Sequence, residues 1–460
     1  MEERRENIMG TQPINRLLPS MAFPIMLSML VQALYNVVDS VFVSMVSENA
    51  LTSVSLAFPV QNLMIAVSVG TAVGINALLS RRLGEKNFEA ANKVAENGIF
   101  VTVLSWAVFA VFGAACSGLF MGAFTQNAEI LAGGTDYMWI VTVFSLGLFM
   151  SVTMERVLQV TGKTVYQMIS QMTGAVVNII LDPVFIFGWL GLPAMGVAGA
   201  AWATVIGQFC GAGMTLFFNL NKNPDIQISF KGFRPSAKAI GRIYTVGLPS
   251  IAMQCVGSLM TFGMNLILMS FSATAVAVFG VYFKLQSFVF MPIFGLNNGM
   301  VPIISYNYGA RRPGRVRKSI LIMSLLVFGY TAVMWSMIIL IPETLIRIFS
   351  SDAALIQDAV PALNMYFAAF IFMDLQYIGQ AVFKSLNKKV FAIFFSLLRK
   401  VFIVVPLTYF LPYAMHMGTD GVFLAEPISN VIGGTACILT MLITIMPELK
   451  RIEVENRRAE

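Results

Sequence analysis

Charged and histidine residues are scarce in this chain. Of its 460 residues only 12% are charged, one is histidine and four are cysteine. Apolar residues make up 57% of the chain, and the mean hydropathy is +0.77. Because so few polar side chains cannot cover a water-facing surface, the composition excludes an ordinary soluble domain. We expect the chain to fold in lipid.

Catalytic and nucleotide-binding motifs are also missing from the sequence. The single histidine, His416, falls in a predicted loop, and there is no Gly-x-x-x-x-Gly-Lys-Ser/Thr nucleotide-binding loop. The cysteines lie inside apolar segments without metal or redox spacing, and we interpret them as packing residues: Cys116, Cys210, Cys255 and Cys437. The sequence therefore predicts no enzyme activity, no cofactor and no use of ATP.

Twelve apolar stretches fill most of the chain. A helix needs about 20 apolar residues to cross the hydrocarbon layer, and each stretch is long enough. The first is preceded by sixteen polar-biased residues and has no cleavage site after it, so we do not expect a signal peptide. The predicted spans are 17–46, 51–79, 99–120, 137–160, 168–189, 197–218, 244–271, 276–306, 320–341, 360–383, 390–413 and 422–446.

Basic residues mark one side of the predicted membrane. Of the 30 lysines and arginines, 26 lie at the N-terminus or around the ends of the even-numbered spans. The opposite loops contain none, except for Arg347 after the ninth span. By the positive-inside rule, both termini are cytoplasmic, and we expect a bacterial inner-membrane protein. The net charge of +7 therefore reflects topology, and we expect no binding of nucleic acid.

The sequence repeats itself at a shift of 225 residues. Aligned pairs include Gln61/Gln286, Gly70/Gly295, Gly74/Gly299, Lys163/Lys388 and Gly196/Gly421. Each half then has six spans and inserts the same way up, so the halves should be related by a pseudo-two-fold axis along the membrane normal. We predict an N-terminal lobe over 1–222, a cytoplasmic linker over 223–238, and a C-terminal lobe over 239–460 with a short cytoplasmic tail.

Five ionisable residues inside predicted spans stand out. Each costs about 2.5 to 3.5 kcal/mol or more at a helix centre, so each is a functional candidate. They are Asp39, Asp182, Lys284, Asp374 and Glu426. Arg399 and Lys400, nearer the cytoplasmic end of the eleventh span, are interpreted as side chains that snorkel to the interface.

Asp39 and Asp182 stand in oxygen-rich sequence. Tyr35 lies one helical turn before Asp39, and Asn178 lies one turn before Asp182. Two carboxylates facing each other in a low dielectric cannot both stay ionised alone, so one would take a proton or the pair would hold Na⁺. The alternative is structural: each aspartate caps a neighbouring helix or lies near an interface.

The other three candidates are open to two interpretations. Lys284 is either a counter-charge to Asp374 or a gate that repels cationic cargo. Glu426, which precedes Pro427, has equally good structural and functional explanations. The prolines Pro24 and Pro183 interrupt the hydrogen bonding of their helices, and we predict conformational hinges there.

Three motifs together resemble the multidrug and toxic compound extrusion (MATE) transporters, in their DinF-like bacterial branch. They are Tyr35-Asn36-x-x-Asp39, Asn178-Ile179-Ile180-Leu181-Asp182-Pro183 and Val301-Pro302-x-x-x-Tyr306-Asn307-Tyr308-Gly309-Ala310. The resemblance implies an all-α membrane protein whose two six-helix lobes form a V, and export of cationic drugs in exchange for H⁺ or Na⁺. It also implies an ion site in the N-terminal lobe, at Asp39, Asn178, Asp182 and Thr204.

The resemblance further implies substrate contacts close to that site, at Gln32, Tyr35, Asn36 and Tyr137. We add Asp374 and Lys284 from the other lobe. The NorM-like branch pairs an acidic residue in the seventh span with an aspartate in the tenth, but the seventh span here has Gln254 and no acid. We therefore predict that ion coupling belongs to the N-terminal lobe.

The predicted function is export of cationic or amphiphilic organic compounds by alternating access, driven by H⁺ or Na⁺. We expect a monomer surrounded by membrane lipids. The alternative is a flippase or exporter of lipid-linked or amphiphilic metabolites, because the sequence does not display its cargo.

Overall fold

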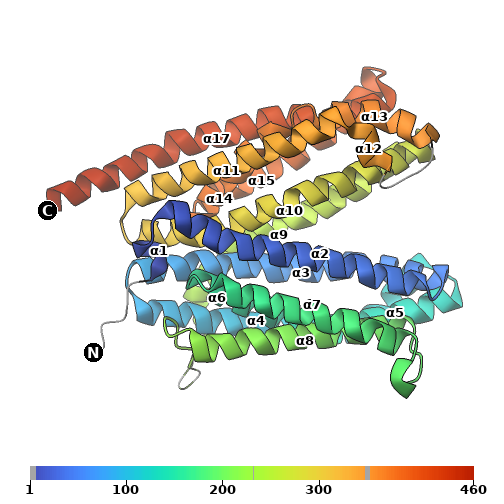
Figure 1. Cartoon of the computed structure of the whole chain (residues 1–460), viewed down its shortest axis with the longest axis horizontal. Helices are drawn as coiled ribbons and strands as arrows, with labels where there is room; N and C mark the ends of the chain where they lie inside the picture. The colour runs from blue at the N-terminus through green and yellow to red at the C-terminus, as the bar shows by residue number, and fades with distance from the viewer. Residues whose placement is uncertain (1–6, 230, 232, 348–352, 460) are drawn as a thin grey trace. The chain divides into compact units, whose positions relative to one another are not determined.

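A computed structural model describes residues 7–229, 231, 233–347 and 353–459. Throughout those residues the chain is helical with short connections, and Figure 1 shows the helices of each half running side by side. The chain divides into two compact units, one of Met1–Gln12 and Pro19–Ile251, the other of Pro13–Leu18 and Ala252–Glu460. The predicted lobe and linker boundaries stay predictions.

The first unit holds the helices of the N-terminal half. In chain order they are α1 (Ile8–Thr11), α2 (Ile14–Ser44), α3 (Glu48–Gly84), α4 (Phe88–Phe124), α5 (Ala128–Val143), α6 (Leu146–Val160), α7 (Thr164–Ile186), the 3₁₀ turn η1 (Trp189–Gly191) and α8 (Val197–Lys222). Helix α9 (Ala237–Met269) begins in this unit and continues into the second.

The second unit holds the C-terminal half. Its helices are α10 (Ala273–Gly309), α11 (Pro313–Leu340), α12 (Pro342–Arg347), α13 (Ala353–Phe367), α14 (Phe370–Ser385), α15 (Lys389–Leu397), the π-helix η2 (Leu398–Val404), α16 (Val405–Tyr409), the π-helix η3 (Phe410–Ala414) and α17 (Gly418–Ala459). The segment from α15 to η3 is one nearly continuous helical stretch whose turns widen twice.

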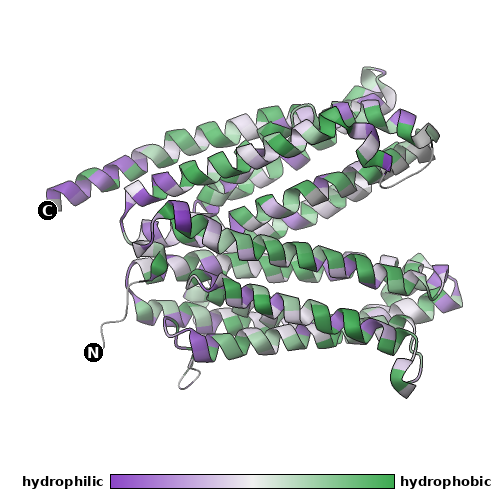
Figure 2. Ribbon diagram, viewed as in Figure 1, coloured by the Kyte–Doolittle hydropathy of each residue, from purple (hydrophilic) through white to green (hydrophobic). Residues whose placement is uncertain are grey.

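The membrane spans agree with the twelve predicted from the sequence. Among the described residues, ten helices are long and apolar enough to cross a membrane, and two bent pairs complete the twelve. The bent pairs are α5 with α6, at 42°, and α13 with α14, at 45°. In Figure 2 the middle parts of the helices are predominantly hydrophobic and their ends more hydrophilic, as lipid requires. The chain is therefore a multi-pass all-α membrane protein.

The repeat extends to details of the turns. Ser47 and Ser272, which are 225 residues apart, each accept a hydrogen bond from the backbone three residues on and so cap α3 and α10. Lys86 and Arg311, again 225 apart, both take left-handed backbone angles, with φ of 55° and 54°. Both closely follow a helix of 37 residues, α3 or α10, and end it in the same way. The duplication therefore fixes the turns as well as the spans.

Helix α17 extends far beyond its predicted apolar core. It runs on to Ala459, and its last turns are hydrophilic (Figure 2). Ion pairs tie this extension to the α10–α11 turn and to the start of α15: Arg311–Glu455 at 2.5 Å, Arg317–Glu453 at 2.9 Å and Lys388–Glu448 at 2.6 Å. The predicted tail is thus a continuation of the last helix.

Glycines let α3 and α9 approach closely within the first unit. A Cβ atom at Gly74 would lie 2.2 Å from the Ile243 carbonyl oxygen, and one at Gly70 would lie 2.9 Å from the Ile251 backbone nitrogen. Because these neighbours are backbone atoms, no side-chain rotation can make room. Gly70 and Gly74 therefore serve close packing between the two helices.

Gly74→Ala should therefore destabilise the protein by about 1 to 3 kcal/mol, the usual cost of overpacking. The thermal unfolding midpoint of the detergent-purified protein measures this cost. Gly241→Ala on the same helix pair is the matched control, because a Cβ atom at Gly241 meets nothing within 4 Å. Equal midpoints for the two variants would contradict the packing argument.

Candidate functional site

The predicted ion site lies in the first unit, where α7 and α8 meet. Asp182 is fully buried on α7, and Asn178 lies one turn before it. The Asn178 amide nitrogen is 3.4 Å from Asp182 Oδ1 and 3.4 Å from Thr204 Oγ1 on α8. Gly174 and Gly207 allow this close contact, because a Cβ atom on Gly207 would lie 2.7 Å from the Gly174 carbonyl oxygen. Asn178 therefore links the aspartate to the threonine.

Asp39 joins this group from α2. Its side chain is partly buried, and it interacts electrostatically with Asp182. Tyr35 and Tyr137 also interact electrostatically with both aspartates. Tyr137 is itself buried in an apolar cluster that includes Met121. Two carboxylates and two phenols from α2, α5 and α7 thus share one water-poor region.

Three acceptor oxygens in this group have no donor. Asp39 Oδ1, Asp182 Oδ2 and Asn178 Oδ1 are all buried, and none has a hydrogen-bond partner among the described residues. An unpaired buried acceptor costs about 1 to 3 kcal/mol, and more when it is charged. A proton on a carboxylate, a bound cation or a water molecule would supply the missing partners.

The oxygen donors suit a hard cation such as Na⁺. Carboxylate, amide and hydroxyl oxygens are the ligands that small hard cations prefer. A transition metal would favour a cluster of three or more His, Cys, Asp or Glu side chains. The part of the chain that the structure describes contains no such cluster. The residues therefore fit H⁺ or Na⁺.

Two of the predicted substrate contacts lie outside the buried group. The Gln32 and Asn36 side chains are exposed on α2, and Asn36 lines a shallow groove with Val37 and Ser40. The predicted hinges lie inside continuous helices: Pro24 within α2 and Pro183 within α7. Their roles stay predictions.

A third carboxylate of this unit, Glu155, was missed. It is buried on α6, interacts electrostatically with Tyr35, and accepts hydrogen bonds from Ser151 at 3.1 Å and Gln171 at 2.7 Å. Its neighbour Arg156 donates to Gln159 at 2.8 Å. The signal was present, because Glu155 lies within the predicted span 137–160. We counted Arg156 among the basic residues at the end of the fourth span and did not consider Glu155 beside it.

In the second unit, Asp374 on α14 is fully buried and Lys284 is not described beyond its backbone. Neither Asp374 oxygen has a hydrogen-bond partner in the described part of the unit. Thr331 on α11 is its polar neighbour. The Lys284 side chain lies outside the described residues, so its predicted interaction with Asp374 stays a prediction.

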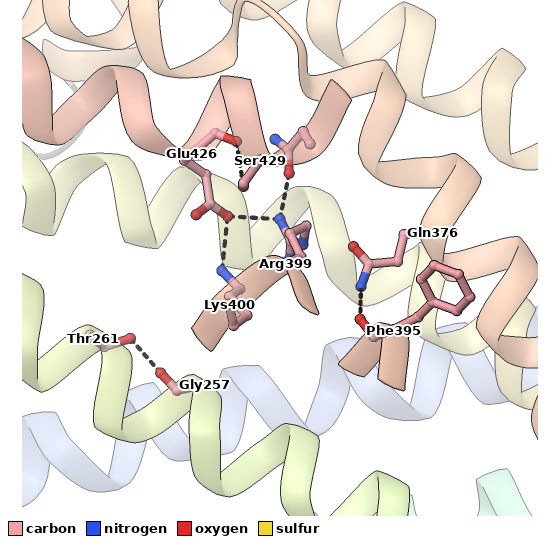
Figure 3. A network of polar contacts seen from close by, with 9 residues as sticks. Gly257, Thr261, Gln376, Phe395, Arg399, Lys400, Glu426 and Ser429 are labelled. Carbon is pink, nitrogen blue, oxygen red and sulfur yellow. Dashed lines mark hydrogen bonds and ion pairs between the residues drawn. The ribbon is translucent and has the colours of Figure 1, made fainter. Parts of the chain in front are cut away.

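Arg399 and Lys400 do not snorkel, contrary to our interpretation. Arg399 Nη1 lies 2.9 Å from Glu426 Oε1, and Lys400 Nζ lies 2.8 Å from the same oxygen. Figure 3 shows Glu426 reaching both cations. Arg399 also donates to the amide oxygen of Asn430, one turn beyond Glu426 on α17. The reason is energetic, because a buried cation needs a partner and α17 places the Glu426 carboxylate within reach.

A duplicated twelve-span helical fold with ionisable side chains buried inside its spans defines the class of this protein: it is a membrane transporter. The sequence matches the MatE family over residues 24–184 and again over 249–410, with the two matches beginning 225 residues apart. The chain therefore belongs to the MATE family, as its motifs predicted, and it is not an enzyme.

Known relatives cover most of the chain. The multidrug export protein MepA of Staphylococcus haemolyticus is 22% identical over 78% of this chain and 78% of its own. A protein of Shewanella oneidensis named FAD transporter is 22% identical over 92% of this chain and 94% of its own. A MOP superfamily transporter of Pyrococcus furiosus has the same fold, with a TM-score of 0.90, 21% identity and coverage of 98% and 100%.

Proposed function

We propose that this protein is a secondary active exporter of cationic or amphiphilic organic compounds, driven by H⁺ or Na⁺. One observation carries the proposal: Asp39, Asp182 and Asn178 leave three buried acceptor oxygens without donors in one cluster. Such a cluster gains free energy when a cation or proton enters it, so its occupancy can drive a conformational change. The MepA relatives, named multidrug export proteins, agree with this cargo.

The residues divide the work as follows. Asp39 and Asp182 bind the coupling cation and, in the alternate state, the positive charge of the substrate, so ion and substrate compete. Asn178 and Thr204 supply neutral oxygens and hold the Asp182 carboxylate in place. Tyr35, Tyr137, Gln32 and Asn36 line the substrate's path. The proposed substrate contacts of the second unit are Asp374 and Lys284.

The setting is the plasma membrane of a bacterium, with both termini in the cytoplasm and a monomer as the working unit. Among the described residues, the basic turns around Arg81, Arg82 and Lys86 and around Arg311, Arg312 and Arg315 close corresponding ends of the two halves. The positive-inside rule assigns those ends to the cytoplasm.

Efflux from reconstituted vesicles tests the proposal. Purified protein is placed in proteoliposomes loaded with ethidium, a fluorescent organic cation, and a proton gradient and a sodium gradient are imposed separately. We expect efflux to accelerate with one of the two gradients. If neither gradient changes the rate, the antiport proposal is wrong, and transport of a lipid-linked cargo becomes the candidate to test.

Bending of α2 at Pro24 is proposed to link ion binding to the change of access. Pro24 is buried within the helix, and its carbonyl oxygen accepts the Ser28 hydroxyl at 2.9 Å. Pro24→Ala returns a backbone donor and favours the helix by about 3 kcal/mol, enough to change a conformational equilibrium about a hundredfold. We expect slower gradient-driven efflux with no loss of thermal stability.

Pro19 provides the control for this prediction, because it lies in the same helix and is exposed. Pro19→Ala should leave the efflux rate close to that of the unmodified protein. Equal rates for Pro24→Ala and the unmodified protein would argue against a hinge at Pro24.

A further inference from the structure

We infer that the Arg399–Lys400–Glu426–Asn430 cluster of the second unit is a recognition site for an anionic group of the substrate, a carboxylate or a phosphate. The inference rests on the proposed function and deepens it, because it adds a preference for those amphiphiles that carry such a group. It is argued from the hydrogen-bond donors of the cluster, from the shape of its helix and from its charge.

Two donors and one acceptor of the cluster are buried without a partner among the described residues, and the acceptor is Glu426 Oε2. Both hydrogen bonds of the Arg399 guanidinium use Nη1, and Nε is buried without a partner. The amide nitrogen of Asn430 is also buried and unpaired among the described residues, while its oxygen accepts from Arg399. The side of the guanidinium that includes Nε is the one that binds carboxylate and phosphate with two parallel bonds. An anion placed there would satisfy Arg399 and Asn430 together.

Charge also favours an anion. Two cations share one oxygen of one carboxylate, so the cluster carries one excess positive charge. The other buried carboxylate of this unit, Asp374, makes no hydrogen bond to either cation. Arg399 is 5% exposed and Glu426 is fully buried, whereas Lys400 is 23% exposed. Lys400 is therefore the most exposed member of a cluster that is otherwise desolvated.

The helix is locally widened where the two cations lie. Arg399 and Lys400 are the second and third residues of the π-helix η2. Adjacent residues of an ordinary α-helix point about 100° apart, yet these two reach the same Glu426 oxygen. Single π-helical turns are rare in proteins overall, and those that occur are often found at functional sites. The turn thus aims two neighbouring basic side chains at one point.

Aromatic residues keep the cluster dry. Tyr282, Tyr366 and Tyr377 are buried and interact electrostatically with both Arg399 and Glu426. The Tyr377 ring also packs 5.2 Å from that of Phe290. In such surroundings an ionic hydrogen bond is stronger than in water, so a single anionic group on the cargo has a large effect on affinity.

Riboflavin and flavin mononucleotide (FMN) form a suitable probe pair, because they differ by one phosphate group. Binding of each to the full-length protein in detergent is measured by quenching of flavin fluorescence. We expect FMN to bind at least about tenfold more tightly than riboflavin, as expected for charge-assisted hydrogen bonds. Equal affinities would overturn the inference.

Two variants assign the preference to the cluster. Lys400→Gln keeps the Arg399–Glu426 pair intact and should lower FMN affinity about tenfold while leaving riboflavin unchanged. Arg399→Lys keeps the charge but loses the two-bond geometry, so it should also reduce the preference. Lys450→Gln, an exposed change of the same charge, should have no effect. A preference that survives in both cluster variants would place the phosphate elsewhere and refute the inference.

A phospholipid headgroup carries the same chemistry as a free phosphate. The measurement is therefore repeated in nanodiscs of phosphatidylcholine and of phosphatidylglycerol. If the preference for FMN is lost only in phosphatidylglycerol, the anionic lipid competes with FMN for the cluster. The natural ligand of the cluster is then a lipid phosphate. If the preference persists in both, the anion belongs to a soluble cargo. The binding assays use no ion gradient. A failed anion-binding test with persistent gradient-driven efflux would refute only the anion site, and anion binding without such efflux would refute only the proposed function.

Discussion

Replacing Asp182 by asparagine is expected to abolish gradient-driven export and to leave the protein folded. The substitution removes the buried carboxylate that interacts with Asp39, so the cluster keeps one carboxylate and loses half of the negative charge that would hold the coupling cation. Asp182 Oδ2 has no donor among the described residues, so an uncharged amide of the same shape removes a desolvation cost. Ethidium efflux from proteoliposomes should fall to the level of protein-free vesicles, with an equal or higher unfolding temperature.

The control for Asp182→Asn is the same change at Asp136, which is exposed on α5 of the same unit. Asp136→Asn should transport at the unmodified rate. Asp39→Asn should reproduce the defect of Asp182→Asn, because the pair acts as one titrating group. Full gradient-driven transport by both Asp39→Asn and Asp182→Asn would remove the basis of the proposed coupling site.

Hydropathy and internal repetition were sufficient to predict the spans. Apolar length alone predicts a helix at each of the twelve places, because lipid leaves the backbone few other ways to satisfy its hydrogen bonds. The breaks within the fourth and tenth spans were not predicted. One break, at Phe144–Ser145, separates α5 from α6, and the other, at Ala368–Ala369, separates α13 from α14. Neither break contains a proline that would predict it. Such bends arise from packing between helices, which a window of residues does not contain.

The candidate site was partly predictable, for a related reason. Asn178 and Asp182 are one helical turn apart, so the sequence alone places them together. The contact between Arg399 and Glu426 joins residues 27 positions apart on different helices. Their charges were visible, but their distance depends on how η2 and α17 pack. Sequence distance therefore separates the predicted part of the site from the part that was missed.

The duplicated halves carry different chemistry on one scaffold. At the 225-residue shift, Arg399 aligns with Gly174 and Glu426 aligns with Ala201, while Asp182 aligns with Leu407. The first unit therefore places an unpaired aspartate pair where the second has apolar residues, and the second places a cluster of two cations and one carboxylate where the first has glycine and alanine.

Glu426→Gln is expected to destabilise the second unit strongly. The change leaves Arg399 and Lys400 buried or half-buried without their shared anion, and breaking a buried pair in this way costs about 3 to 5 kcal/mol. The unfolding midpoint of the purified protein in detergent should fall well below that of the unmodified protein. Glu343→Gln is the matched control, because its pair with Arg347 is exposed and should contribute at most about 1 kcal/mol.

Two further measurements separate the charge from the packing in this prediction. Adding Lys400→Gln to Glu426→Gln removes one uncompensated cation, so the double variant should regain part of the lost stability. If the freed cations bind anions, FMN should raise the unfolding midpoint of Glu426→Gln more than riboflavin does, because a ligand stabilises the state that binds it. A Glu426→Gln protein as stable as the Glu343→Gln control would show that the two cations do not depend on Glu426.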